Sequence, residues 1–163
     1  MGDFMLTNII SREKRKIKPL PSLDEKNPKV IGIMEKQLLF KLLDSIAPTL
    51  EENIEKVESC QFLKYNWDRK NGFPFSKRII NKTKGLLSEL NIQPEVSPTG
   101  RNSFYFQYTL PNKSFITFEI SEKFLYIVTV PYGVYNESSE NTSRNISSNY
   151  INSKLDEFVK KYG

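Results

Sequence analysis

The chain of 163 residues has the usual length of one domain, and 38% hydrophobic residues, including 11 Phe and 8 Tyr, predict a globular protein. It contains no histidine and only one cysteine, which excludes Ser-His and Cys-His nucleophile pairs, histidine or thiolate zinc sites and an intramolecular disulfide. The single cysteine and the absence of an apolar leader favour the cytoplasm, and no apolar run reaches the ~20 residues that a membrane helix needs.

The net charge of +5 is unevenly distributed along the chain. Residues 1–29 show no sustained hydrophobic period, contain three prolines and carry the basic run from Ser11 to Lys18. We interpret them as an extended or partly disordered basic arm, and residues 30–163 as a single domain. A second basic stretch runs from Lys64 to Lys84.

Three helices are predicted after the arm. From Val30, apolar residues recur at three- and four-residue steps until Pro48 ends the pattern. Thr49 is a typical N-cap for a second helix, which we expect to run to about Tyr65. Ser76 caps a third helix with a regular apolar stripe and lysines and arginine on its other faces.

The hydrophobic period changes to two after the third helix. Strands are predicted around residues 92–97, 104–110, 116–120 and 124–130, and the short turns between them require antiparallel neighbours. We interpret the polar segment from Tyr135 to Asn149 as a mobile loop.

A closing helix is predicted to begin near Ser147 or Ser148, with Ile151, Leu155 and Phe158 on its apolar face. The predicted fold class is therefore α+β: N-terminal helices, an antiparallel β-meander of about four strands, and a C-terminal helix.

No catalytic or cofactor-binding pattern stands out in the sequence. None of the seven glycines forms a phosphate-binding loop. Glu95, Glu119 and Glu122 are the candidates for a carboxylate magnesium site, but they fall near strand ends, where solvated carboxylates are common. We therefore expect no metal, no cofactor and no enzymatic activity.

Three residues near the end of the second helix have structural interpretations. Cys60 is expected to pack as a small apolar residue. Trp67, the only tryptophan, is expected to plug the space between helices and sheet. Asp68 is expected to fix the following turn by accepting hydrogen bonds from backbone N–H groups.

Several short motifs occur together in residues 60–130. They are Asn66-Trp67-Asp68, Pro74-x-Ser76, a Leu-rich helix, Pro94-Glu95-Val96-Ser97-Pro98-Thr99-Gly100 and aromatic-rich strands. In order and spacing the chain resembles an uncharacterised family of small bacterial proteins that read "nWDGyGA.P.S", a helix, "PevsPtpdGg" and "leW". It departs from that pattern at Arg69-Lys70-Asn71 and at Gln107-Tyr108. The resemblance implies an ordered domain and no particular activity.

The first functional hypothesis is a protein-binding module, such as an antitoxin-, immunity- or inhibitor-like partner of another protein, or a homo-oligomer. Because side chains alternate between the two faces of a sheet, the predicted strands leave a second apolar face. Its partner-binding candidates are Tyr105, Phe115, Leu125 and Ile127. Either the C-terminal helix or another chain is expected to cover this face.

The alternative hypothesis is a nucleic-acid-binding protein. Its candidate residues are Arg12, Lys14, Arg15, Lys16 and Lys18 in the arm and Lys77, Arg78, Lys82 and Lys84 on the third helix. Tyr105 and Phe115 on the sheet could stack against single-stranded bases.

Overall fold

The computed structural model describes residues 28–163, so the predicted arm lies outside the described residues except for its last two positions. Within this part the elements are α1 (Pro28–Ile46), α2 (Leu50–Ser59), α3 (Lys77–Glu89), β1 (Glu95–Pro98), β2 (Phe104–Thr109), β3 (Phe115–Ile120), β4 (Leu125–Val130), β5 (Ser139–Ser143) and α4 (Ser148–Tyr162). The predicted α+β class is confirmed. None of the helices described combines the length and apolar character that a membrane crossing requires.

The helix boundaries follow from their capping residues. Thr49 and Glu52 form a capping box: Thr49 Oγ1 accepts a hydrogen bond from Glu52 N at 3.2 Å, and Glu52 Oε2 accepts one from Thr49 N at 2.7 Å. Ser76 caps α3 through its side chain, as predicted, and Ser147 caps α4, whose start near Ser147 or Ser148 was predicted. α1 spans Pro28–Ile46 in the described part of the chain, and it therefore includes two residues before the expected start at Val30. The second helix is shorter than predicted, since a 3₁₀ turn at Cys60–Phe62 ends it.

The strands form one antiparallel sheet in the order β1-β2-β3-β4-β5. Four of them correspond to the predicted meander. The fifth, β5, is a correction: it lies in the segment expected to be a mobile loop, where it pairs with β4 from Thr129↔Ser139 to Leu125↔Ser143. Its side chains are mostly exposed, so its place in the sheet depends on backbone hydrogen bonds rather than on an apolar pattern.

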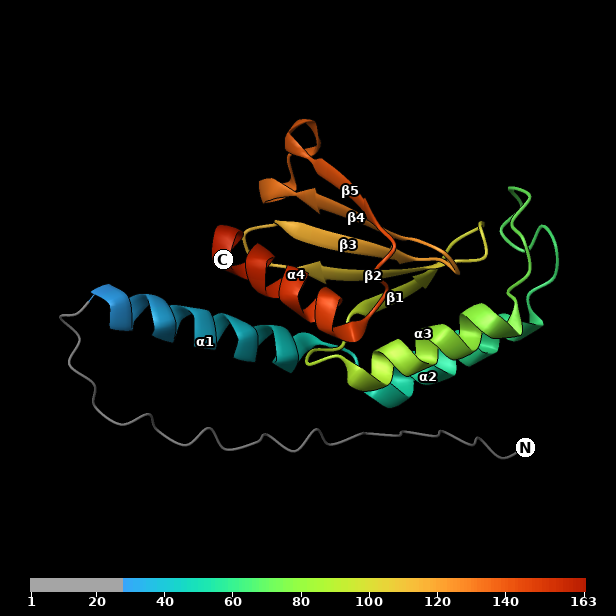
Figure 1. Cartoon of the computed structure of the whole chain (residues 1–163), viewed down its shortest axis with the longest axis horizontal. Helices are drawn as coiled ribbons and strands as arrows, with labels where there is room; N and C mark the ends of the chain where they lie inside the picture. Colours follow the sequence, from blue (N-terminus) through green and yellow to red (C-terminus); the bar gives the residue numbers. More distant parts are fainter. Residues whose placement is uncertain (1–27) are drawn as a thin grey trace, which may run out of the picture.

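One face of the sheet, the core face, carries the domain core. Figure 1 shows the helices gathered along one side of the sheet, with α4 lying across it and α2 beside α3. The core-face side chains are Val96, Phe104, Phe106, Tyr108, Ile116, Phe118, Ile120, Leu125 and Ile127, and all are buried. They form one hydrophobic cluster with apolar residues of α3 and α4, such as Leu87 and Leu155. The opposite surface is called the open face below.

The residues after α2 pack as predicted. Trp67 lies half-buried against the core, with its ring 6.0 Å from that of Phe75, and its Nε1 donates a hydrogen bond to the carbonyl oxygen of Phe73 at 3.0 Å. Cys60 is buried in the core, and this burial raises the pKa of its thiol. Cys60 therefore packs as a small apolar residue and is not poised as a thiolate.

Candidate functional site

The four partner-binding candidates on the strands do not share one surface, which corrects the sequence-based prediction. Leu125 and Ile127 pair with Ile120 and Phe118, so they belong to the core face and are buried under the helices. Tyr105 and Phe115 lie on the open face, half-buried. The terminal helix therefore covers two of the four candidates and leaves the other two on the opposite side of the sheet.

A buried carboxylate organises the open face. Glu119 Oε2 forms an ion pair with Arg101 Nη2 at 2.6 Å, and Glu119 Oε1 accepts a hydrogen bond from Ser103 Oγ at 2.6 Å. The same Arg101 nitrogen donates to the hydroxyl of Tyr105 at 3.0 Å. Tyr126, in the next strand, donates to Glu140, and this hydrogen bond raises the pKa of the Tyr126 hydroxyl.

This arrangement makes the open face a poor surface for nucleic acid. Glu95 and Glu140 lie on the same side of the strands as Glu119, and their negative charges repel phosphate. The charge of Glu119 itself is compensated by Arg101. The ring of Phe115 is covered in part by Tyr135, at a centroid distance of 5.9 Å. The predicted stacking role of Tyr105 and Phe115 therefore has no electrostatic support.

The three carboxylates considered as magnesium ligands have separate partners or positions. Glu119 pairs with Arg101 on the open face, Glu122 accepts a hydrogen bond from Ser76 Oγ at 2.8 Å beside α3, and Glu95 is exposed at the start of β1. Within residues 28–163, no three His, Cys, Asp or Glu side chains gather as metal ligands.

Three of the four basic candidates on α3 are engaged within the fold. Lys82 Nζ donates hydrogen bonds to the carbonyl oxygens of Ser121 and Glu122, and burial lowers the pKa of this amine. Lys84 pairs with Glu58 in α2, and Arg78 lies 3.7 Å from the carboxylate of Glu122. Lys77 is exposed. The helix face therefore ties α3 to its neighbours and does not form the basic surface that the sequence suggested.

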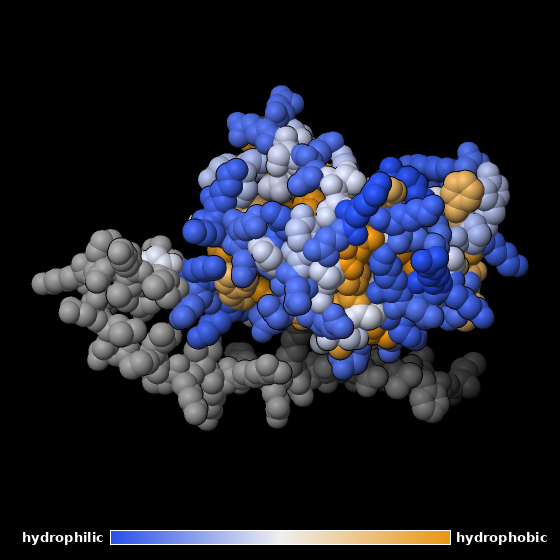
Figure 2. Space-filling model, viewed as in Figure 1, coloured by the Kyte–Doolittle hydropathy of each residue, from blue (hydrophilic) through white to orange (hydrophobic). Residues whose placement is uncertain are grey.

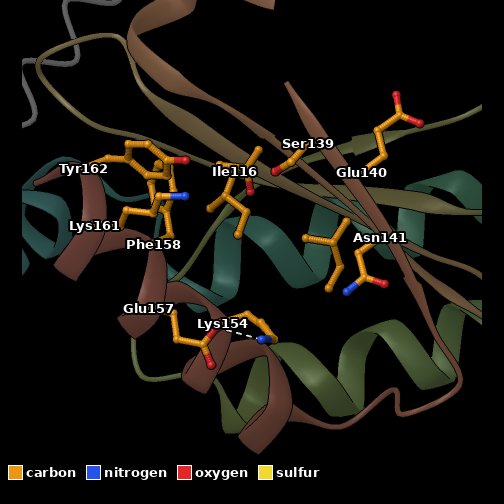
Figure 3. A pocket seen from close by; sticks show the side chains of 11 residues that line it. Ile116, Ser139, Glu140, Asn141, Lys154, Glu157, Phe158, Lys161 and Tyr162 are labelled. Carbon is orange, nitrogen blue, oxygen red and sulfur yellow. Dashed lines mark hydrogen bonds and ion pairs between the residues drawn. The ribbon is translucent and has the colours of Figure 1, made fainter. Parts of the chain in front are cut away.

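A pocket of about 190 Å³ opens between α4 and the outer strands. Its walls include Ile116 and Phe158, and Figure 3 shows the side chains of Phe158, Lys161 and Tyr162 on one side and Ser139 and Asn141 of β5 on the other. The Lys154 amine at its rim is neutralised by Glu157, 2.6 Å away, which raises the pKa of that amine. The pocket is thus a gap between α4 and the sheet, where Lys154 and Glu157 pair with each other.

An exposed apolar flank runs along α1. Leu38, Leu42 and Ile46 are spaced four residues apart and expose 67%, 42% and 66% of their surfaces, whereas Leu43 packs into the core. Ile46 also lines a hollow of about 480 Å³ between the end of α1, α2 and β1. These three residues, called the α1 flank, are therefore an apolar surface that leads into a groove.

The loop of residues 63–76, called the connector, closes on itself between α2 and α3. Asn66 N donates a hydrogen bond to the Gly72 carbonyl oxygen at 2.7 Å, and Asn66 Oδ1 accepts one from Asn71 N at 2.9 Å. Asp68 Oδ1 accepts from the backbone N–H groups of Lys70 and Gly72, each at 2.8 Å, which confirms its predicted role. The hydrogen bond from Lys70 holds the pKa of the Asp68 carboxyl below its usual range.

The connector packs against the turn between β1 and β2, although the two segments are far apart in the sequence. Phe73 N donates to the Gly100 carbonyl oxygen at 2.9 Å, and Ser76 N donates to Asn102 Oδ1 at 2.9 Å. A Cβ atom added at Gly100 would come within 2.8 Å of Asp68 Oδ2. The sequence identified the Asn-Trp-Asp and Pro-Thr-Gly motifs separately, and the structure places them in contact.

The connector carries exposed aromatic and cationic side chains within one short loop. These are Lys64, Tyr65, Arg69, Lys70 and Phe73, all of them exposed and here called the connector surface. The rings of Tyr65 and Phe73 meet edge to face, with centroids 6.2 Å apart. Figure 2 shows hydrophobic atoms among hydrophilic ones at this end of the molecule. Sequence reasoning noted the basic residues here but had no signal that the two rings would be exposed beside them.

Comparisons of the chain with protein-family models, with curated proteins and with solved structures found no match. The resemblance to a family of small bacterial proteins therefore stays a prediction. The class that the fold itself defines is an α+β domain with a five-stranded antiparallel sheet and helices packed on one face.

Proposed function

We propose that this protein is a non-catalytic protein-binding module that docks a partner along the α1 flank. An antitoxin-, immunity- or inhibitor-like protein would act in this way. The observation that carries the proposal is the exposure of Leu38, Leu42 and Ile46 on one side of one helix. Apolar residues four positions apart form the contact surface when an amphipathic helix binds in a hydrophobic groove or against another helix.

Leaving the α1 flank in water costs free energy. Each large aliphatic side chain is worth about 1.5–3 kcal/mol when it is fully buried, so three adjacent ones supply a useful share of a binding free energy. The hollow beside Ile46 extends the surface toward β1, which gives a partner a shaped end to fill. A partner that covers the flank is either another protein or a second copy of this chain.

The test uses the full chain, with Leu38→Glu and Leu42→Glu combined. We expect the unchanged chain either to show a concentration-dependent mass in light scattering or to retain a partner in affinity capture from its host. The double variant should lose that association while its melting temperature stays within a few degrees, because both side chains are exposed. Gln37→Glu, on the polar side of the same helix, is the matched control. A strictly monomeric chain that captures the same proteins with and without the flank would refute the proposal.

The second functional class, nucleic-acid binding, is favoured by a different surface. The arm residues proposed for it lie outside the described residues, and three of the four α3 residues have partners within the fold. The connector surface combines exposed cations and rings.

A further inference from the structure

The cations of the connector surface differ from four basic side chains of the neighbouring elements. Lys82, Lys84, Arg78 and Arg101 each contact an acidic or carbonyl oxygen of the fold. None of the ion pairs formed within residues 28–163 uses Lys64, Arg69 or Lys70. Those three side chains are exposed, and none has an acidic partner within that part of the chain.

The one acidic side chain in residues 64–73 is already occupied. Asp68 turns its Oδ1 inward to two backbone N–H groups, so it holds the loop closed beneath the cations. The loop then projects three positive charges with a single negative charge bound to its own backbone. A ligand that is negatively charged along its length complements this surface.

The backbone of Arg69 adds a second observation. Its φ of 60° lies in the left-handed region, which costs a side-chain-bearing residue roughly 1–2 kcal/mol. Asn66 and Asn71, with φ of 63° and 65°, are residues that tolerate this region, whereas arginine has no such preference. Arg69 therefore keeps an exposed side chain at a position with a conformational cost, as Lys113 and Tyr132 also do elsewhere in the described residues.

The two exposed rings, Tyr65 and Phe73, distinguish nucleic acid from other anionic ligands. Tyr65 and Phe73 are 61% and 58% exposed, and their edge-to-face contact leaves ring surface open to solvent in the same closed loop that carries the cations. Exposed rings next to phosphate-binding cations are the features by which proteins hold unpaired bases, since every base can stack on an aromatic face. An acidic protein segment would use the charges but would gain little from the rings.

We propose that the connector surface binds single-stranded nucleic acid. Tyr65 and Phe73 stack against bases, and Lys64, Arg69 and Lys70 contact the phosphates. This activity goes beyond protein binding at the α1 flank and uses a separate part of the molecule. It also places the contact on a short closed loop, a kind of segment that frequently carries function.

The test measures binding of the full chain to a fluorescein-labelled oligothymidylate of 20 nucleotides, by fluorescence anisotropy at several salt concentrations. Phe73→Ala should weaken binding about 5- to 150-fold, which is the range for one stacked base. Arg69→Gln combined with Lys70→Gln should reduce the slope of log K against log salt by about 1.4, because each phosphate contact on a single strand contributes about 0.7. Both variants keep the backbone hydrogen bonds of the loop, and circular dichroism checks that they are folded.

The control variants change one exposed aromatic and one exposed basic residue outside the connector. Tyr135→Ala, in the β4–β5 connection, and Lys160→Gln, in α4, should leave affinity and salt slope unchanged. The proposal is overturned if the unchanged chain does not bind at low salt. It is also overturned if the Phe73 and Arg69/Lys70 variants bind as tightly as the unchanged chain, which would assign binding to other basic residues. Equal affinity for polyglutamate, insensitive to Phe73→Ala, would identify an acidic protein segment as the ligand instead.

Discussion

Asp68 shows how one side chain can set the geometry of a whole surface. Its carboxylate helps to close the connector from inside, together with the hydrogen bonds of Asn66 to Asn71 and Gly72. Backbone donors keep its pKa low. The stability it adds is therefore present above the pKa of an unfolded aspartate, near 3.9, and is lost as the pH falls through its lower folded value. The role of Asp68 was predictable from the sequence, because aspartate at a turn commonly binds the backbone ahead of it.

The contact between Asp68 and Gly100 leads to a prediction that sequence patterns alone would not give. Gly100→Ala would place a methyl group 2.8 Å from Asp68 Oδ2, and the carboxylate cannot turn away without losing its backbone hydrogen bonds. We expect a loss of about 1–3 kcal/mol in the free energy of unfolding, measured by urea denaturation.

Gly85 provides the matched control for that substitution. A Cβ atom there meets nothing within 4 Å, and the residue lies exposed in the middle of α3. Gly85→Ala should therefore stabilise the protein by about 0.5–1 kcal/mol, because alanine is the better helix former. Equal effects of the two substitutions would show that the connector does not pack against the β1–β2 turn as described.

At the scale of elements, the sequence predicted the helices and strands that have an apolar period and missed a strand that has none. Caps and stripes located α3 and α4 closely, as Ser76 and Ser147 show. β5 was missed because Ser-Glu-Asn-Thr-Ser has no hydrophobic alternation, and a strand at a sheet edge can be held by its backbone alone.

The assignment of faces failed for a related reason. β4 has apolar residues at its odd and at its even positions. Its sequence therefore does not say which set points to the core, Leu125 and Ile127 or Tyr126 and Val128. The register is set by the turn before it, where Ile120 pairs with Leu125. A shift of one residue would have exchanged the two faces.

The buried face of α4 and the exposed α1 flank lead to opposite predictions for the free energy of unfolding of the isolated chain. Leu155 of α4 is 2% exposed beneath the sheet, and Leu155→Ala should cost about 2–5 kcal/mol of unfolding free energy. Leu38 of α1 is 67% exposed, so Leu38→Ala should change it by no more than about 0.5 kcal/mol. Chemical denaturation of dilute, monomeric protein measures both. A large loss for Leu38→Ala would mean that the α1 flank is part of the fold rather than a docking surface.

At the scale of the molecule, the two proposed surfaces lie far apart. Figure 1 shows α1 toward one end of the long axis and the connector at the other, with the sheet and its core between them. Neither surface could be assembled from the sequence alone, because each depends on which side chains tertiary packing leaves exposed. The apolar period of α1 did not distinguish the exposed Leu38 from the buried Leu43.

This separation predicts that the two activities are independent. Sites that share no contacts combine additively, and coupling between them requires an element with two arrangements that both ligands bias. The rigid core between the flank and the connector offers no such element among the described residues, since its large side chains are fully buried in one packed cluster. Leu38→Glu with Leu42→Glu should therefore leave the oligonucleotide dissociation constant within about twofold of the unchanged chain, and Arg69→Gln with Lys70→Gln should leave the partner association unaltered. Anisotropy titrations of the full chain, with and without its protein partner, measure this coupling. A shift of tenfold, or about 1.4 kcal/mol, in either direction would show that α1 and the connector communicate and that the domain has a second arrangement.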